Sequence, residues 1–301
     1  MRIGYPCINR GLACRCTHGF RLASYSPHRL EEAVRANLDG LQGILEFNAA
    51  RGILFFRISS DIVPFASHPV MSVRWQERFR GRFARIGRYI RDHAIRVNMH
   101  PDQFTLINSP DEAIFARSRE ELLYHARVLD LLGLDLTNKI QIHVGGVYGD
   151  KDSAIARFVA RYRSLPERIR RRLVVENDHV SYSLEDCLRV HQACGIPVVL
   201  DVLHQRVLRG PFGVKKALAR AAATWKGVDG IPFVDYSLQA ENGLRGAHAE
   251  SIRVPEFRRF LSLTRPIDFD VMLEIKDKES SAAKAVAAAG EDKRFFRPAI
   301  N

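Results

Sequence analysis

The sequence lacks several features that define other classes of protein. No apolar run reaches 18 residues, which argues against a membrane-spanning helix. The opening residues MRIGYPCINR lack the apolar core of a secretory signal peptide. The five cysteines are odd in number and irregularly spaced, which argues against a disulfide framework. We therefore expect a globular protein of the reducing cytosol, with no membrane partner.

Acidic residues are too few to balance the basic ones. The chain has 46 Lys and Arg against 34 Asp and Glu, which gives a formal net charge of +12. Many of the arginines lie in two stretches, 74–91 and RYRSLPERIRRR. A domain this basic is expected to associate with a polyanion such as nucleic acid, although a solvated helix surface would carry the same residues.

Also absent are a glycine-rich phosphate loop after the first predicted strand, internal repeats and a low-complexity linker. Short apolar runs instead alternate with segments of helical periodicity, such as 28–52 and 109–133. The apolar runs predict eight strands, 3–7, 53–59, 96–100, 139–144, 172–177, 197–202, 232–237 and 269–275. This alternation favours a (β/α)₈ TIM barrel over an open doubly wound sheet. We expect one domain, 1–301, in which 280–301 form a terminal helix and a basic tail.

Polar side chains occur at the C-terminal ends of most predicted strands, where the active sites of such barrels lie. They include four carboxylates and three histidines: Glu176, Asp201, Asp235, Glu274, His100, His143 and His204. Buried carboxylates gathered at one rim would repel one another and become protonated unless cations lay among them. Because mixed imidazole and carboxylate ligands suit Zn²⁺ or Mn²⁺, the pattern predicts a cluster of divalent metals.

Eight motifs along the chain carry a resemblance to a known family. They are GYPC with Asn9, PFASHP (64–69), NMHPDQF (98–104), HVGGVYGDK (143–151), VVENDH (174–179), DVLHQ (201–205), GAHAE (246–250) and MLEIKDKE (272–279). Their order and spacing, over nearly the whole chain, resemble the UV damage endonucleases, which are (β/α)₈ barrels related to endonuclease IV. The resemblance implies a metal-dependent DNA repair enzyme that acts on double-stranded DNA. It would cut the phosphodiester 5′ to pyrimidine dimers and 6-4 photoproducts, leaving a 3′-hydroxyl and a 5′-phosphate.

The resemblance also implies which residues hold two or three divalent ions, with Mn²⁺ expected and Zn²⁺ or Mg²⁺ as alternatives. The implied ligands are His100, His143, Glu176, Asp201, His204, Asp235, His248 and Glu274. Glu176 would bridge two ions, Asp201, Asp235 and Glu274 would complete the second, and His204 and His248 would hold the third. His68 would stand near the scissile phosphate, and Lys276 would neutralise negative charge beside it.

This chain departs from the family pattern in the seventh predicted strand. Phe233 and Asp235 stand where the family commonly has Lys and His. An aspartate can still bind a metal, and the exchange makes the second site richer in oxygen. This favours Mn²⁺ or Mg²⁺ over Zn²⁺ and leaves the metal preference open.

The loop after the third predicted strand would contact the lesion. Gln103 and Phe104 match the pair that the family inserts into the duplex where damaged bases are flipped out, although Tyr is common at the second position. Filling the vacated stack offsets part of the cost of flipping. Tyr5 and Asn9 would face the extruded nucleotides. No obligate protein partner is implied, and in a prokaryote the enzyme would associate with the nucleoid.

Three other interpretations remain open from the sequence. An abasic-site endonuclease of the endonuclease IV type would use the same barrel and metals. A metal-dependent sugar isomerase also uses barrel carboxylates, histidines and two metals, but it has no need of a net charge of +12. A basic DNA-binding protein with a structural metal would bind DNA without cutting it.

Overall fold

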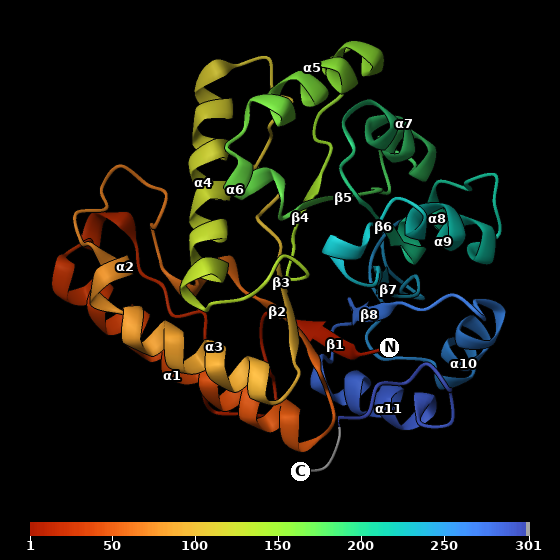
Figure 1. Cartoon of the computed structure of the whole chain (residues 1–301), viewed down its shortest axis with the longest axis horizontal. Coiled ribbons are helices and arrows are strands. Elements are labelled where there is room, and N and C mark those ends of the chain that lie inside the picture. The colour runs from red at the N-terminus through yellow and green to blue at the C-terminus, as the bar shows by residue number, and fades with distance from the viewer. Residues whose placement is uncertain (299–301) are drawn as a thin grey trace.

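The computed structural model describes residues 1–298, in which the eight predicted strands close into one parallel barrel (Figure 1). The strands pair in sequence order, and the Ile3–Val271 register joins the last strand to the first. The strands are β1 (Ile3–Pro6), β2 (Phe55–Ile58), β3 (Arg96–Met99), β4 (Ile140–His143), β5 (Leu173–Glu176), β6 (Val198–Asp201), β7 (Phe233–Tyr236) and β8 (Asp270–Leu273). The prediction of a (β/α)₈ barrel is confirmed, although each strand is shorter than its predicted run.

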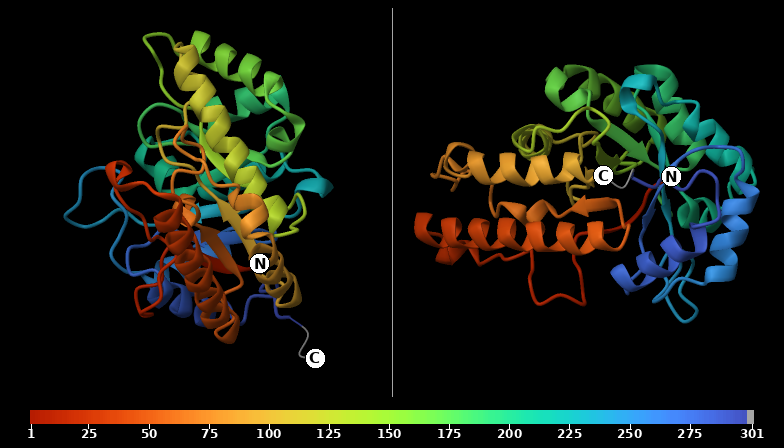
Figure 2. Two further views of the ribbon diagram at one scale, coloured as in Figure 1. Left: turned by 90° about the vertical axis from the view of Figure 1, so that its left-hand side faces the viewer. Right: turned by 60° about the horizontal axis from the view of Figure 1, so that its bottom comes forward.

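Helices follow the strands and cover the outside of the barrel (Figure 2). They are α1 (Pro27–Ala50), α2 (Trp75–Arg78), α3 (Arg80–Asp92), α4 (Glu112–Leu131), α5 (Lys151–Ser164), α6 (Glu167–Arg170), α7 (Leu184–Cys194), α8 (Val202–Val207), α9 (Val214–Ala222), α10 (Val254–Leu263) and α11 (Glu279–Ala289). The helix predicted from residue 109 begins at Glu112, because the Asp111 carboxylate caps it by accepting from the amides of Ala113 and Ile114. Among the helices of residues 1–298, none has the length and apolar character needed to cross a bilayer.

Side chains inside the barrel form three layers, because alternate residues of a strand point to the same side. The middle layer is an apolar cluster of Phe55, Val174, Val199, Phe233 and Met272. Charged and polar side chains, all buried, lie on each side of it: Arg96, Lys139 and Asp270 toward the N-terminal ends of the strands, and Arg57, Gln141, Glu176, Asp201 and Asp235 toward the C-terminal ends. The apolar layer therefore separates the polar C-terminal rim from the other end of the barrel.

The N-terminus and the tail after α11 lie together at the N-terminal end of the barrel (Figure 2). The amide of Phe296 donates to the carbonyl of Met1 at 2.9 Å. The Arg294 guanidinium donates to the carbonyls of Leu261 and Ile267 at 2.6 and 2.8 Å. The tail thus packs on the barrel up to residue 298, and its last three residues, 299–301, lie outside the described part of the chain.

Candidate active site

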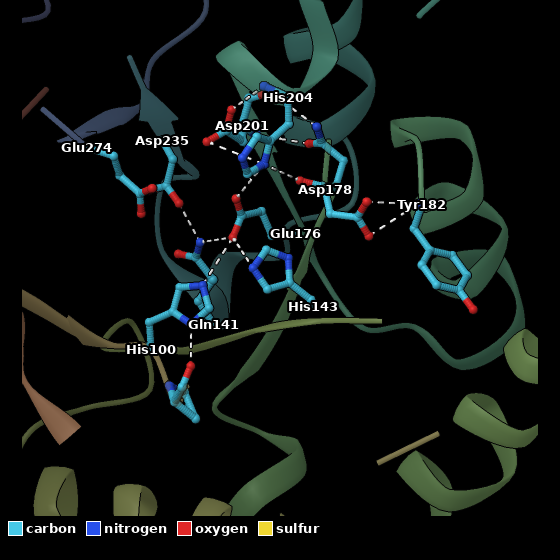
Figure 3. Close-up of polar contacts among 12 residues, drawn as sticks. His100, Gln141, His143, Glu176, Asp178, Tyr182, Asp201, His204, Asp235 and Glu274 are labelled. Carbon is cyan, nitrogen blue, oxygen red and sulfur yellow. Dashed lines mark hydrogen bonds and ion pairs between the residues drawn. The ribbon is translucent and has the colours of Figure 1, made fainter. Parts of the chain in front are cut away.

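The C-terminal rim of the barrel gathers most of the predicted metal ligands (Figure 3), beside a cavity of about 600 Å³. They come from different elements: His100 follows β3, His143 ends β4, Glu176 ends β5, Asp201 ends β6, His204 lies in α8, Asp235 lies in β7 and Glu274 follows β8. Parallel strands of a closed barrel all end at the same rim, so residues far apart in sequence meet there.

Glu176 lies at the centre of this group, with 1% of its surface exposed. Its Oε2 is 3.3 Å from Nε2 of His100 and 3.8 Å from Nε2 of His143. Its Oε1 is 3.3 Å from Nδ1 of His204. Burial alone would raise the pKa of Glu176, but the three imidazoles lower it well below its usual range. The carboxylate is therefore ionised, and its two oxygens face different histidines.

Asp201 and His204 form a second, coupled pair at the start of α8. Oδ1 of Asp201 accepts from the His204 amide at 2.6 Å, while its Oδ2 is buried without a hydrogen-bond partner. Burial and the neighbouring carboxylates raise the pKa of Asp201 well above its usual value, against the opposing effect of His204. Burial would lower the pKa of His204, but Asp201 and Glu176 outweigh it and raise the pKa to about 10. Without another cation, the rim is therefore neutralised in part by a proton on His204.

Asn177, directly after β5, fixes the position of this pair. Its side-chain amide donates to the Asp201 carbonyl at 3.1 Å and accepts from the Asp201 amide at 2.9 Å. Its own carbonyl accepts from Nδ1 of His204 at 2.9 Å. One asparagine thus ties the end of β5 to the end of β6 and orients the imidazole, as outer residues do around metal ligands.

The donor atoms of the rim fit divalent ions. Three sets of donor atoms each lie within 4.8 Å of one another: His100, His143 and Glu176; Glu176, Asp201 and His204; Asp201, Asp235 and Glu274. Nδ1 of His100 donates to the Pro101 carbonyl at 2.8 Å, which leaves its Nε2 lone pair for a ligand. Oδ2 of Asp201 has no hydrogen-bond partner and lies 3.7 Å from Nδ1 of His204, so it too can bind a cation. Buried His, Glu and Asp groups that could hold metal ions are therefore present.

The grouping matches the one that the family resemblance implied for His100, His143 and Glu176 and for Asp201, Asp235 and Glu274, but it differs for His204. Asp201 and His204 were assigned to different ions, yet the structure places them together with Glu176. The reason is local, because Asp201 is the N-cap of α8 and brings the third residue of that helix back to its own carboxylate. His248 lies outside the three sets, with its Nε2 3.5 Å from Oε2 of Glu274.

The third set contains a cation that sequence reasoning missed. Arg57 of β2 donates through Nη2 to both Asp235 oxygens, at 2.9 and 3.1 Å, and through Nη1 to Oε1 of Glu274. Burial raises the pKa of Asp235, and despite the opposing effect of Arg57 it reaches about 7. Burial also opposes ionisation of Glu274, but Arg57 prevails and lowers its pKa.

Two further rim residues were also missed. Gln141 donates through its amide nitrogen to the carboxylates of Glu176 and Asp235 (Figure 3). His179 lines the cavity, and its ring centroid lies 5.0 Å from that of His204. Strand alternation could have identified Gln141, which lies two residues before His143 and so faces the same side. His179 appears in the VVENDH motif, but as a loop residue it carried no periodic signal.

Two residues predicted to act at the scissile phosphate do not join this cluster. Lys276 points to Glu250, with 3.5 Å between the charged atoms, and half of its side chain is exposed. His68 lies in an exposed loop, where its Nδ1 accepts from the Val70 amide at 3.0 Å. Neither residue lines the cavity beside His100, His143 and Glu176.

The loop after β3 carries the predicted wedge beside the cavity. Gln103 lines the cavity together with His100. Phe104 is 73% exposed, an unusual position for so large an apolar ring. The Phe104 amide donates to the Asp102 carboxylate at 2.8 Å, which holds the turn that presents the ring. An exposed aromatic ring next to an open cavity is available to stack on another molecule.

Tyr5 and Asn9, by contrast, are not presented to solvent. Tyr5 is fully buried, and its hydroxyl donates to Asn48 of α1 at 2.7 Å and accepts from Asn9 at 2.8 Å. Asn9 is 1% exposed and caps the turn at Gly11 and Leu12. The expectation that they face extruded nucleotides is corrected, because both side chains are used to fix the loop after β1.

Comparisons with known proteins agree with this geometry. A family model described as UV-endonuclease UvdE matches residues 1–290. The chain is 37% identical over 294 residues to a UV DNA damage endonuclease of Clostridium perfringens, covering 97% of this chain and 71% of that protein. It is 34% identical over 253 residues to a UV DNA damage endonuclease of Bacillus cereus strain Q1, covering 83% and 80% of the two chains.

Solved structures also match this chain over nearly its whole length. The crystal structure of SacUVDE matches with a TM-score of 0.92 and 41% identity, covering 97% of this chain and 98% of that one. Endonuclease IV from Thermus thermophilus matches with a TM-score of 0.63 and 16% identity, covering 97% and 100% of the two chains. At that identity the second likeness concerns the fold alone.

Proposed function

The chain belongs to the UV-endonuclease UvdE family of DNA repair enzymes, and from this we propose that it cuts double-stranded DNA 5′ to UV photoproducts. The products would be a 3′-hydroxyl and a 5′-phosphate. The reaction would be a metal-assisted hydrolysis at the C-terminal rim of the barrel. Family membership identifies an enzyme, so a sugar isomerase and a DNA-binding protein without activity are set aside.

The position of Glu176 is the observation that carries this proposal. Its two oxygens face two separate sets of ligands, His100 and His143 on one side and Asp201 and His204 on the other. A carboxylate held this way can bridge two divalent ions. Two-ion sites are a recurrent solution for phosphodiester hydrolysis, because attacking and departing oxygens are both stabilised.

Bound divalent ions would supply a water-derived nucleophile at neutral pH and stabilise negative charge on the reacting phosphate. The protein's own contribution is to keep the ligands ionised and oriented. The three imidazoles keep Glu176 a carboxylate. The Pro101 carbonyl orients His100, and Asn177 orients the Asp201–His204 pair. These contacts are made before substrate arrives, so the rim needs little reorganisation during the reaction.

Mn²⁺ is the ion we propose, in two positions. The first would be held by His100, His143 and Glu176, and the second by Glu176, Asp201 and His204. This donor set mixes imidazole nitrogen with carboxylate oxygen, which suits Mn²⁺ or Zn²⁺ better than the oxygen-only environment preferred by Mg²⁺.

The lesion would be recognised by the loop after β3. We propose that Phe104 enters the duplex where damaged bases leave the stack, with Gln103 beside it at the cavity. Crosslinked pyrimidines stack poorly, so the cost of flipping them is smaller than for intact DNA. The net charge of +12 would supply affinity for the phosphate backbone without reading sequence.

End-labelled duplexes test the proposal directly. Four substrates are compared, with a pyrimidine dimer, a 6-4 product, an abasic site or no lesion, each after chelation and reloading with Mn²⁺, Zn²⁺ or Mg²⁺. We expect one cut 5′ to the dimer and the 6-4 product, with Mn²⁺ the most effective ion. Far better cutting of the abasic duplex would instead identify an enzyme of the endonuclease IV type. Cutting that persists after complete metal removal would contradict the metal mechanism.

A further inference from the structure

One permanent cation lies inside the rim, on a strand that otherwise carries apolar residues. Arg57 belongs to the β2 sequence Phe-Phe-Arg-Ile and is 4% exposed. Its guanidinium reaches across the barrel to β7 and β8, where it contacts both oxygens of Asp235 and one oxygen of Glu274. Nη2 also donates to the side-chain carbonyl of Gln141 at 3.0 Å. Side chains from β4, from β7 and from the residue after β8 thus converge on one buried positive group of β2.

We propose that the Arg57 guanidinium takes the place of a divalent ion between Asp235 and Glu274, so that this chain binds two ions where its carboxylates could hold three. This inference rests on the proposed metal-dependent function and specifies the composition of that site. The set Asp201, Asp235 and Glu274 has the spacing of a metal site. Its cation, however, is built into the protein.

The first argument is the state of each carboxylate oxygen. Both Asp235 oxygens accept from Arg57, and Oδ2 also accepts from Gln141. In Asp201, by contrast, Oδ2 is buried without a hydrogen-bond partner. A buried acceptor without a partner is costly, whereas a paired one is not. Oδ2 of Asp201, whose nearest cationic group is His204 at 3.7 Å, is therefore free to bind an external cation, whereas both oxygens of Asp235 are occupied.

The second argument is the orientation of Gln141, which lies between Arg57 and Glu176. Its carbonyl oxygen accepts from Arg57, and its amide nitrogen donates to Glu176 and Asp235. This arrangement requires a donor on the Arg57 side and acceptors on the other. A metal ion between Asp235 and Glu274 would compete with the guanidinium for the same oxygens.

The third argument is charge. The four rim carboxylates, Arg57 and two divalent ions together have a net charge of +1, which a single phosphodiester would cancel. A third divalent ion would raise the net charge to +3 in a group of largely buried side chains. Two ions are therefore favoured over three.

Metal content of the full-length protein tests the inference. Protein saturated with Mn²⁺ and freed of excess ion is measured by elemental analysis and by native mass spectrometry. We expect two ions per chain in the wild type. Two isosteric variants form the matched comparison: Asp201→Asn should drop to one ion, whereas Asp235→Asn should retain two.

Anomalous scattering from Mn²⁺-soaked crystals of the wild type gives a second readout that depends on no variant. We expect peaks beside Glu176 and none between Asp235 and Glu274. Three ions in the wild type, a peak between those two carboxylates, or loss of an ion in Asp235→Asn would overturn the inference and leave the proposed function intact. A wild type that binds no ion would overturn both, which keeps the two failures distinct.

Arg57→Met provides the converse test. Removing the guanidinium leaves Asp235 and Glu274 buried without their cation, so a third ion should bind at high Mn²⁺ concentration. A folded Arg57→Met protein that still binds two ions would contradict the inference. If this variant does not fold, the Asp201 and Asp235 pair and the anomalous map decide.

Discussion

Both ends of the barrel interior bury charged side chains, and the two ends differ in how completely these charges are paired. At the N-terminal end, the three guanidinium nitrogens of Arg96 donate to Thr137, Ile231 and Asp270. The Lys139 ammonium lies 2.6 Å from Asp229. Asp270 accepts from the Arg2 amide as well as from Arg96. Each of these charged groups is satisfied by the protein itself.

At the C-terminal rim, two of the four carboxylates, Asp235 and Glu274, are paired with a permanent cation of residues 1–298, Arg57, whereas Glu176 and Asp201 have only histidines beside them. Oδ2 of Asp201 and Nδ1 of His143 are buried without partners. Fully satisfied buried networks stabilise a fold, whereas partly satisfied ones cost stability and are retained where a ligand completes them. The contrast indicates that the N-terminal end is structural and that the rim is completed by ions and substrate.

The largest expected effect is on stability, and it would come from breaking the fully paired network around Arg96 and Asp270 at the N-terminal end. Arg96→Met removes the buried guanidinium from Asp270 and leaves it only the more distant, partly exposed Arg2, at 3.7 Å, so it should lower the free energy of unfolding by about 3–5 kcal/mol. His248→Ala at the rim removes an imidazole whose Nδ1 has no partner, and should cost about 1 kcal/mol or less in chelated protein. Denaturant unfolding of both variants after metal removal measures the difference. Equal losses of unfolding free energy in the two variants would mean that the two ends do not differ in how far their buried charges stabilise the fold.

The next effect concerns activity. Glu176→Gln keeps the shape of the side chain but removes its negative charge, and should lower the single-turnover rate of incision by at least about 10²–10³-fold. Asp270→Asn is the control at the other end: it should destabilise the protein without changing the rate per folded molecule. An Asp270→Asn rate reduced as much as that of Glu176→Gln would show that the N-terminal end takes part in catalysis.

The barrel and most of the rim could be predicted from the sequence, because both follow from local patterns. The apolar runs marked eight strands, and the polar residues after them marked the rim. Parallel strands in a closed barrel then bring His100, His143, Glu176 and Asp201 together without further information.

The rest depended on contacts that no local pattern encodes. Arg57 looks like an ordinary strand residue until the strands of Asp235 and Glu274 are known to face it. Tyr5 was assigned to the lesion from the family resemblance, yet its hydroxyl donates to Asn48, which lies on a helix 43 residues later. Lys276 follows β8 by three residues, beyond the point where strand alternation fixes the direction of a side chain.

A smaller effect, on DNA affinity, would test whether an exposed apolar residue contributes to binding only at the C-terminal end of the barrel. Phe104→Ala removes the ring beside the cavity and should weaken binding to a dimer-containing duplex by about 1–3 kcal/mol, the range for one base stacked on an aromatic ring. Val228→Ala alters an exposed apolar residue in the turn before β7, at the opposite end, and should leave binding unchanged. Fluorescence anisotropy with damaged and intact duplexes measures both. A Phe104→Ala protein with unchanged preference for damaged DNA would contradict the wedge.

The smallest expected effect is on the acid stability of the N-terminal end. Arg294 donates to both oxygens of Asp292 at 2.8–3.0 Å and holds the pKa of that carboxyl well below its usual value of 3.8. A carboxyl whose pKa is lower in the folded state stabilises the fold above pH 3.8 and loses this contribution as the pH falls. Between about pH 4 and pH 2, Asp292→Asn should therefore lose unfolding free energy less steeply than the wild type. Asp268→Asn, which removes a half-exposed carboxylate nearby, should keep the wild-type slope. Chemical denaturation of chelated protein across this pH range would separate the two variants, because the pairing of charges at this end does not depend on metal.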